Sequence, residues 1–131
     1  MKDKIEQTVS AAITNKNYAV GNDIVFLPHF KQSLTSEFKN KVFTPNELAY
    51  CDQFDDAVLR YASTWAAKEA VYKAFKQLSG DVLGWNKIEI VREKIAGKPG
   101  VVLHQYPHQF QISITIAHDN DYVWAIAVIE K

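Results

Sequence analysis

The chain lacks the features that would place it outside the cell or in a membrane. Its 131 residues include a single cysteine, Cys51, which excludes an intrachain disulfide and cysteine-rich zinc motifs and favours a reducing compartment. No stretch reaches the roughly 20 apolar residues that a membrane helix needs, and the start Met-Lys-Asp-Lys lacks the apolar core of a signal peptide. We therefore expect a cytoplasmic protein.

The chain also lacks an excess of charge of either sign. Fifteen basic and fifteen acidic residues give a formal net charge of zero, which argues against a bulk electrostatic grip on nucleic acid or on a membrane. A charged partner would have to be attracted by a local patch. Hydrophobic residues make up 47% of the sequence, so the composition predicts one globular domain with a buried core.

The first part of the chain predicts a helix followed by a strand. Residues 3–14 carry isoleucine or valine at every fourth position, which is typical of one apolar helix face. Residues 18–27 form an apolar run that reads as a buried strand, and Pro28 ends it.

Two helix starts can be identified in the middle of the chain. Thr44, Pro45 and Glu47 form a capping box with proline at the first helical position. Asp55 or Asp56 is expected to cap a longer helix that continues to about residue 78. Its small residues, Ala62, Ala66 and Ala70, form a strip against which a strand backbone could pack closely.

The C-terminal third reads as strands separated by turns. The segments with strand patterns are residues 87–92, 101–104, 110–117 and 122–130. The last two are joined by a tight connection that begins at His118. The order of strand, helices and then strands predicts an α+β fold, with an antiparallel sheet packed against the long central helix.

Residues 65–74, Trp-Ala-Ala-Lys-Glu-Ala-Val-Tyr-Lys-Ala, are the most informative segment. Glu69 and Lys73 stand four residues apart on one helix face, and Lys68 lies beside them. A carboxylate beside two ammonium groups can hold a divalent cation and a phosphate together. The alternative is an ordinary salt bridge on a solvated helix, with Lys68 facing solvent.

Asp23 is an acid within the apolar strand of residues 18–27. An isolated buried carboxylate is costly, so Asp23 should be ion-paired, hydrogen-bonded or bound to a metal. The alternatives to a metal are a salt bridge with a lysine or a partly exposed strand end. For His118 the alternative to a binding role is an ordinary turn histidine.

Three segments together resemble the 4′-phosphopantetheinyl transferases, specifically the short holo-acyl-carrier-protein synthase type. They are Val-Gly-Asn-Asp-Ile-Val at residues 20–25, the helix segment at 65–74, and Ile-Ser-Ile-Thr-Ile-Ala-His-Asp at 112–119. The helix matches the family pattern Ala-Ala-Lys-Glu-Ala-x-x-Lys-Ala at every defined position. The resemblance covers about residues 19–131 and leaves residues 1–18 as an N-terminal helical extension.

The resemblance implies transfer of 4′-phosphopantetheine from coenzyme A to a serine of an apo-acyl carrier protein, with 3′,5′-ADP released. It implies Mg²⁺, or Mn²⁺, held by Asp23 and Glu69. Lys73 would contact phosphate, and Lys68 and His118 would be further coenzyme A contacts. Glu69 and Lys73 are the catalytic candidates, and the serine proton would go to Glu69 or to a metal-bound water.

The resemblance also implies partners. Short members of the family form homotrimers with the coenzyme A cleft between subunits. The carrier protein would dock on the segment after the Asp23 strand, where His29, Lys31, Lys39 and Lys41 could attract an acidic partner.

Some positions depart from the family pattern. Phe26 and His29 stand where the family usually has an acid and an arginine, and Ala117 stands where it has serine. Two other functions therefore stay open: a non-catalytic member that binds coenzyme A or a carrier protein, and another Mg²⁺-dependent enzyme acting on a phosphate ester. The sequence names neither the carrier protein nor the pathway.

Overall fold

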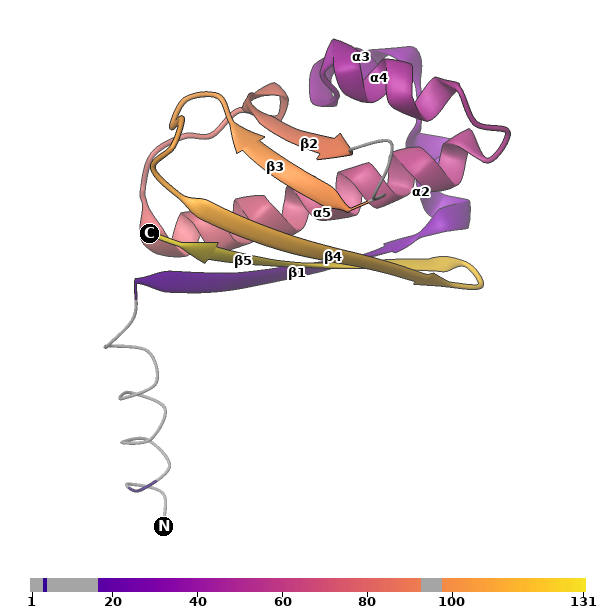
Figure 1. The fold of residues 1–131 in the computed structure, drawn as a ribbon. Helices are drawn as coiled ribbons and strands as arrows, with labels where there is room; N and C mark the ends of the chain where they lie inside the picture. Colours follow the sequence, from indigo (N-terminus) through magenta and orange to yellow (C-terminus); the bar gives the residue numbers. More distant parts are fainter. Residues whose placement is uncertain (1–3, 5–16, 93–97) are drawn as a thin grey trace.

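The computed structural model describes Lys4, residues 17–92 and residues 98–131 (Figure 1). The helix predicted over residues 3–14 therefore lies, apart from Lys4, outside the described residues. No helix in the described part of the chain is long and apolar enough to cross a lipid bilayer.

A strand, a series of helices and a group of strands follow one another, as predicted. In order they are β1 (Tyr18–Phe26), α2 (Leu27–Ser33), α3 (Ser36–Val42), α4 (Pro45–Asp52), α5 (Ala57–Leu78), the 3-10 turn η1 (Trp85–Lys87), β2 (Ile88–Arg92), β3 (Pro99–Leu103), β4 (Gln111–Asp119) and β5 (Tyr122–Glu130). The α+β class is confirmed.

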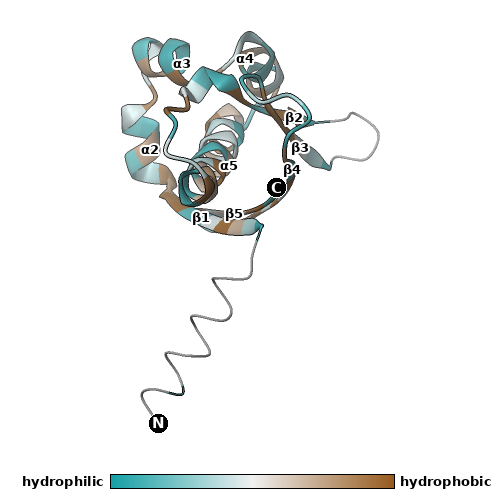
Figure 2. Cartoon of the chain, turned by 90° about the vertical axis from the view of Figure 1, so that its left-hand side faces the viewer, coloured by the Kyte–Doolittle hydropathy of each residue, from teal (hydrophilic) through white to brown (hydrophobic). Residues whose placement is uncertain are grey.

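The strands pair antiparallel in two hydrogen-bonded groups instead of one sheet. β1, β5 and β4 form one sheet in that order, and β2 pairs with β3. Figure 2, which looks toward one end of α5, shows the strands and the short helices arranged around this helix. α5 is thus the centre of the fold, with strands on one side and α2, α3 and α4 on the other.

Local sequence signals explain where several of these elements begin. Thr44 accepts a hydrogen bond from the Glu47 amide, and the Glu47 carboxylate accepts one from the Thr44 amide, so the predicted capping box is confirmed. Asp56 occupies the N-cap position of α5, but its side chain does not cap the helix. It accepts instead from Arg60 Nε at 3.2 Å.

β1 packs on α5 without a side chain between them at Gly21. A Cβ atom at this position would lie under 3.0 Å from the Ala70 carbonyl oxygen and the Ala74 amide nitrogen. Ala66, Ala70 and Ala74 are fully buried. The predicted close approach of a strand to the alanine strip is therefore confirmed, and it fixes the strand that carries Asp23 against the helix.

We predict that Gly21→Ala lowers the free energy of unfolding by about 1–3 kcal/mol, the usual cost of overpacking a core. The added methyl group must displace backbone atoms of α5, which cannot move aside as a side chain can. Chemical denaturation measures the change.

Gly80→Ala is the matched control, because a Cβ there meets nothing within 4 Å. Its effect should stay within about 0.5 kcal/mol, as for most surface substitutions. Equal stability of the two variants would show that β1 and α5 are not in direct contact at Gly21.

Candidate functional site

Asp23 and Lys73 meet where β1 crosses α5. Lys73 Nζ lies 2.8 Å from Asp23 Oδ1 and also donates to the Asn22 carbonyl oxygen at 3.1 Å. The Asp23 side chain is 11% exposed and that of Lys73 is 51% exposed. The acid is therefore nearly enclosed, while the ammonium group stays accessible to a ligand from solution.

Glu69 lies one helical turn before Lys73 and completes the cluster beside Asp23, with which it can share a hydrogen bond when protonated. Burial, the negative charge of Asp23 and that hydrogen bond raise the pKa of Glu69 to about 7, while Lys73 opposes the shift. Burial first, and then the neighbouring Asp23 carboxylate, thus favour the neutral form of Glu69, so that this acid is only partly ionised at neutral pH. A cation between the two carboxylates would relieve their repulsion.

The cluster of Asp23, Glu69 and Lys73 differs from a solvated i,i+4 salt bridge. The ion pair of Lys73 joins it to β1 and not to Glu69. No group of three or more His, Cys, Asp or Glu side chains suited to a metal occurs within residues 17–92 and 98–131. A cation here would have two protein carboxylates and further oxygen ligands from water or substrate, the donor set that suits Mg²⁺.

Lys68 is not part of this cluster. Its side chain is completely buried, and Nζ donates to Glu47 Oε1 of α4 at 2.6 Å. Burial lowers the pKa of Lys68, while Glu47 opposes the shift. The expectation that Lys68 faces phosphate or solvent is therefore corrected, because α4 and β2 cover this face of α5.

His118 lies within β4, one residue before its end, and not in the turn as expected. The turn itself is formed around Asn120, whose positive φ of 53° suits a tight hairpin. The sheet register places His118 opposite Val123 of β5, which in turn pairs with Val25 of β1. His118 is thus separated from Asp23 by the width of β5 and by two residues along β1.

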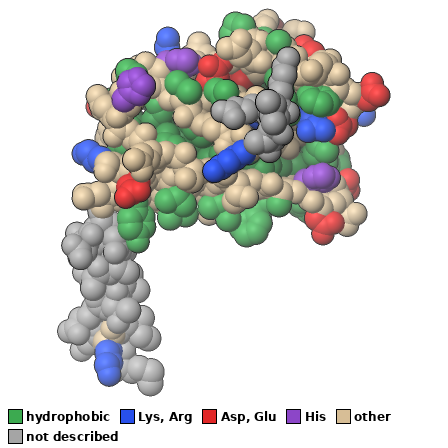
Figure 3. Space-filling model, viewed as in Figure 1, with side chains coloured by type: hydrophobic (Ala, Val, Ile, Leu, Met, Phe, Trp, Pro, Cys, Tyr) green, Lys and Arg blue, Asp and Glu red, His purple; other side chains and the backbone are tan. Residues whose placement is uncertain are grey.

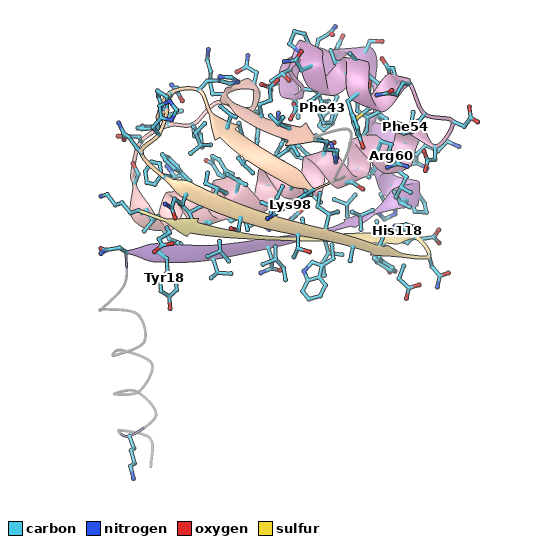
Figure 4. The ribbon with its side chains drawn as sticks, in the orientation of Figure 1. Tyr18, Phe43, Phe54, Arg60, Lys98 and His118 are labelled. Atoms are coloured by element: carbon cyan, nitrogen blue, oxygen red, sulfur yellow. The ribbon has the colours of Figure 1, made fainter. Side chains whose placement is uncertain are left out.

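His118 lines a cavity of about 460 Å³ together with other basic side chains. They are Arg60 of α5, Arg92 of β2 and Lys98; Figure 4 labels His118, Arg60 and Lys98. Arg92 lies over the Tyr50 ring and donates to Thr64 Oγ1 at 3.1 Å. The residues that line this cavity do not include Asp23, Glu69 or Lys73, so one chain presents its basic cavity apart from its acidic cluster.

Sequence reasoning missed the two arginines, since neither belongs to a recognised motif. Arg60 and Arg92 are far apart in the sequence. They line the same cavity only because β2 packs beside α5. The spacing of Asp56 and Arg60, one helical turn apart, predicts the ion pair between these two residues. It does not predict that Arg60 lines a cavity.

The basic residues expected to attract a carrier protein lie on α2 and α3. Lys31 and Lys41 are exposed, whereas Lys39 Nζ lies over the Tyr61 ring at 4.7 Å from its centre. His29 packs edge-on against Phe26 at the end of β1, with ring centres 4.9 Å apart.

The outer face of the β1–β5–β4 sheet carries a group of large exposed apolar side chains on β1 and β5. Alternation along β1 and β5 turns every second side chain away from α5. Those exposed by 38–60% are Tyr18, Val20, Ile24, Tyr122, Trp124 and Val128. Figure 3 shows apolar side chains protruding along the lower edge of the domain, where β1 and β5 lie in Figure 1. In Figure 4 the side chain of Tyr18 points away from the rest of the domain. A cavity of about 420 Å³ lies on this face between Ile24, Ala117 and Trp124.

Comparison with known proteins gives the same assignment along most of the chain. Residues 19–127 match the model of the 4′-phosphopantetheinyl transferase superfamily. A holo-acyl-carrier-protein synthase from Chlorobaculum parvum is 35% identical over 114 residues, which cover 85% of this chain and 97% of that protein.

Solved structures agree in fold. The acyl carrier protein synthase of Mycobacterium tuberculosis is 29% identical with a TM-score of 0.69, covering 86% of this chain and 96% of that one. The holo-acyl-carrier-protein synthase of Helicobacter pylori, solved in complex with coenzyme A, is 24% identical with a TM-score of 0.71, covering 85% and 99%. The chain therefore belongs to the 4′-phosphopantetheinyl transferase superfamily, as an enzyme of its holo-acyl-carrier-protein synthase type.

Proposed function

We propose that the protein transfers 4′-phosphopantetheine from coenzyme A to a serine of an apo-acyl carrier protein in a Mg²⁺-dependent reaction that releases 3′,5′-ADP. The observation that carries the proposal is the cluster of Asp23, Glu69 and Lys73, brought together by β1 and α5. The serine oxygen would bond to the phosphorus that bears pantetheine. The bond from that phosphorus to the bridging pyrophosphate oxygen would break, and 3′,5′-ADP would leave.

The two acids of the cluster fit the metal that the family uses. Asp23 and Glu69 would hold Mg²⁺, and the bound ion would neutralise charge on the pyrophosphate. Asp23 is already engaged by Lys73. Glu69 is therefore the acid that we assign to take the proton of the serine hydroxyl, which must be lost as the new phosphorus–oxygen bond forms.

Lys73 is suited to contact the transferred phosphoryl group. Its ammonium group is half exposed yet fixed by Asp23 and the Asn22 carbonyl. A positioned cation of this kind stabilises the negative charge on phosphoryl oxygens, and positioning with charge neutralisation dominates such reactions.

The basic cavity would serve the nucleotide part of coenzyme A, whose phosphates suit Arg60, Arg92 and Lys98. Because one chain holds this cavity apart from its acidic cluster, a complete cleft would need a second copy. We therefore propose a homotrimer that packs through the apolar outer face of β1 and β5. The free, buried Cys51 is in keeping with a cytoplasmic location.

We predict that intact-mass measurement after incubation with coenzyme A, Mg²⁺ and an apo-carrier protein shows the gain of one phosphopantetheine group. Asp23→Asn and Glu69→Gln should each slow the transfer by about 100-fold or more, since a preorganised charge is lost. Lys73→Met should be as damaging, while Lys73→Arg keeps the charge and should be milder.

Asp55→Asn, which removes an exposed carboxylate in the loop before α5, is the matched control and should be unaffected. EDTA should abolish the transfer and added Mg²⁺ should restore it. Full turnover in EDTA would rule out the two-carboxylate metal site.

Docking of the carrier protein should depend on Lys31 and on the pair Lys39 and Lys41. We expect Lys31→Glu, or reversal of both charges on α3, to raise the KM for carrier protein and to leave that for coenzyme A unchanged. Exposed charges are screened over roughly 8 Å at physiological salt, so the same KM should rise as salt is added.

Lys131→Glu provides a control at the opposite end of the sheet from α2. If neither salt nor the reversals change the KM for carrier protein, docking is not electrostatic. Phe26 then becomes the better candidate, because it is only partly buried whereas Phe30 is 6% exposed.

The proposed assembly predicts a trimer in sedimentation velocity. Ile24→Glu places a charge on the outer face, where the side chain is now 60% exposed, and should yield a folded monomer with little activity. Val102→Glu, at a 40% exposed valine of β3, should leave the trimer intact. A fully active wild-type monomer would refute the assembly.

A further inference from the structure

A second group of charged side chains lies inside the protein, away from solvent. Glu47 of α4 is 1% exposed and Lys68 of α5 is fully buried, with 2.6 Å between Oε1 and Nζ. Lys68 directly precedes Glu69 in the chain, so this interior ion pair is attached to the helical turn that carries the site acid.

Both oxygen atoms of the Glu47 carboxylate accept hydrogen bonds. Besides Lys68, Oε1 accepts from the Thr44 amide at 2.9 Å, and Oε2 accepts from the Ile90 amide at 2.8 Å. One carboxylate therefore ties together the start of α4, the middle of α5 and the backbone of β2.

The network continues from this carboxylate toward the surface. The Thr44 hydroxyl donates to Glu89 Oε2, and Glu89 Oε1 lies 3.1 Å from His104 Nε2. Among the described side chains, none has a buried nitrogen or oxygen atom without a hydrogen-bond partner. A fully satisfied network of this kind resists rearrangement, because any shift of α5 would leave a buried charge unpaired.

The network holds α5 on the side opposed to β1. On the β1 side, Gly21 brings backbone against backbone at Ala70 and Ala74. Successive residues on a helix point about 100° apart, so fixing Lys68 also fixes the direction of Glu69. Rotation or sliding of α5 would separate Glu69 from Asp23, which sits on a different element.

We propose that Glu47 and Lys68 are positioning residues for phosphopantetheine transfer. They hold α5 in the setting that places Glu69 and Lys73 against Asp23, and Lys68 does not touch the substrate. The proposal rests on the proposed function. It assigns to Lys68 a role different from the phosphate contact expected from its place in the helix motif.

A double-mutant cycle with Lys68→Met, Glu47→Gln and the double variant tests the proposal. Each single change should lower kcat by at least about tenfold and alter the KM for coenzyme A by less than about twofold. Because both act through one interaction, the double variant should be no slower than the worse single variant. Circular dichroism and a melting curve first establish that each variant is folded at the assay temperature.

Other outcomes would contradict the positioning role of Glu47 and Lys68. Effects that multiply in the double variant, or a KM for coenzyme A that rises in Lys68→Met alone, would mean that Lys68 contacts phosphate independently of Glu47. If a single variant does not fold, the double variant, which removes both buried charges, is measured alone. A raised KM for coenzyme A in that variant would overturn the proposal.

Direct Mn²⁺ titration followed by electron paramagnetic resonance separates this proposal from the proposed function. Wild type that binds Mn²⁺ but transfers nothing would count against the proposed function. Both single variants should bind Mn²⁺ more weakly than wild type does. The double variant should show no further loss of Mn²⁺ affinity. Unchanged Mn²⁺ affinity in both would show that the pair does not position Glu69.

Discussion

The contact between β1 and α5 at Gly21 is the constraint on which the rest of the structure depends. It presses a strand backbone directly onto a helix backbone, so no flexible side chain separates the two elements. Asp23 follows two residues later and therefore meets Glu69 and Lys73 at fixed distances. The other strands of the sheet extend from β1 through β5 to β4, so the position of the whole sheet around α5 follows from this contact.

The parts of the fold that depend on local chemistry could be predicted. Thr44 and Glu47 start α4 because their groups bond within one turn. Pro28, expected to end a strand over residues 18–27, lies instead in the first turn of α2, just after β1 ends at Phe26. The partner of Lys68 could not be predicted. Glu47 lies 21 positions earlier on another helix, and helical periodicity does not tell which element will cover a given face.

Some residues of the candidate site could be predicted from the sequence and others could not. Asp23, Glu69 and Lys73 were identified through the motifs, and the structure brings them together, while their chemical roles stay predictions. Arg60 and Arg92 could not be predicted as site residues, because the cavity that they line forms only when β2 packs beside α5. Trp124 lies on the exposed face of β5 with Tyr122 and Val128, because the elements that the structure describes cover only the other face of the sheet.

The central place of α5 has a consequence for how the protein opens. A helix enclosed by the other elements loses its backbone hydrogen bonds only when those elements separate, so its amide protons should exchange with solvent as slowly as the whole domain unfolds. Glu69 and Lys73 thus belong to the most slowly opening part of the molecule. The helix therefore stays in place while a ligand binds, because the half-exposed ammonium group of Lys73 can be reached from solution without movement of α5.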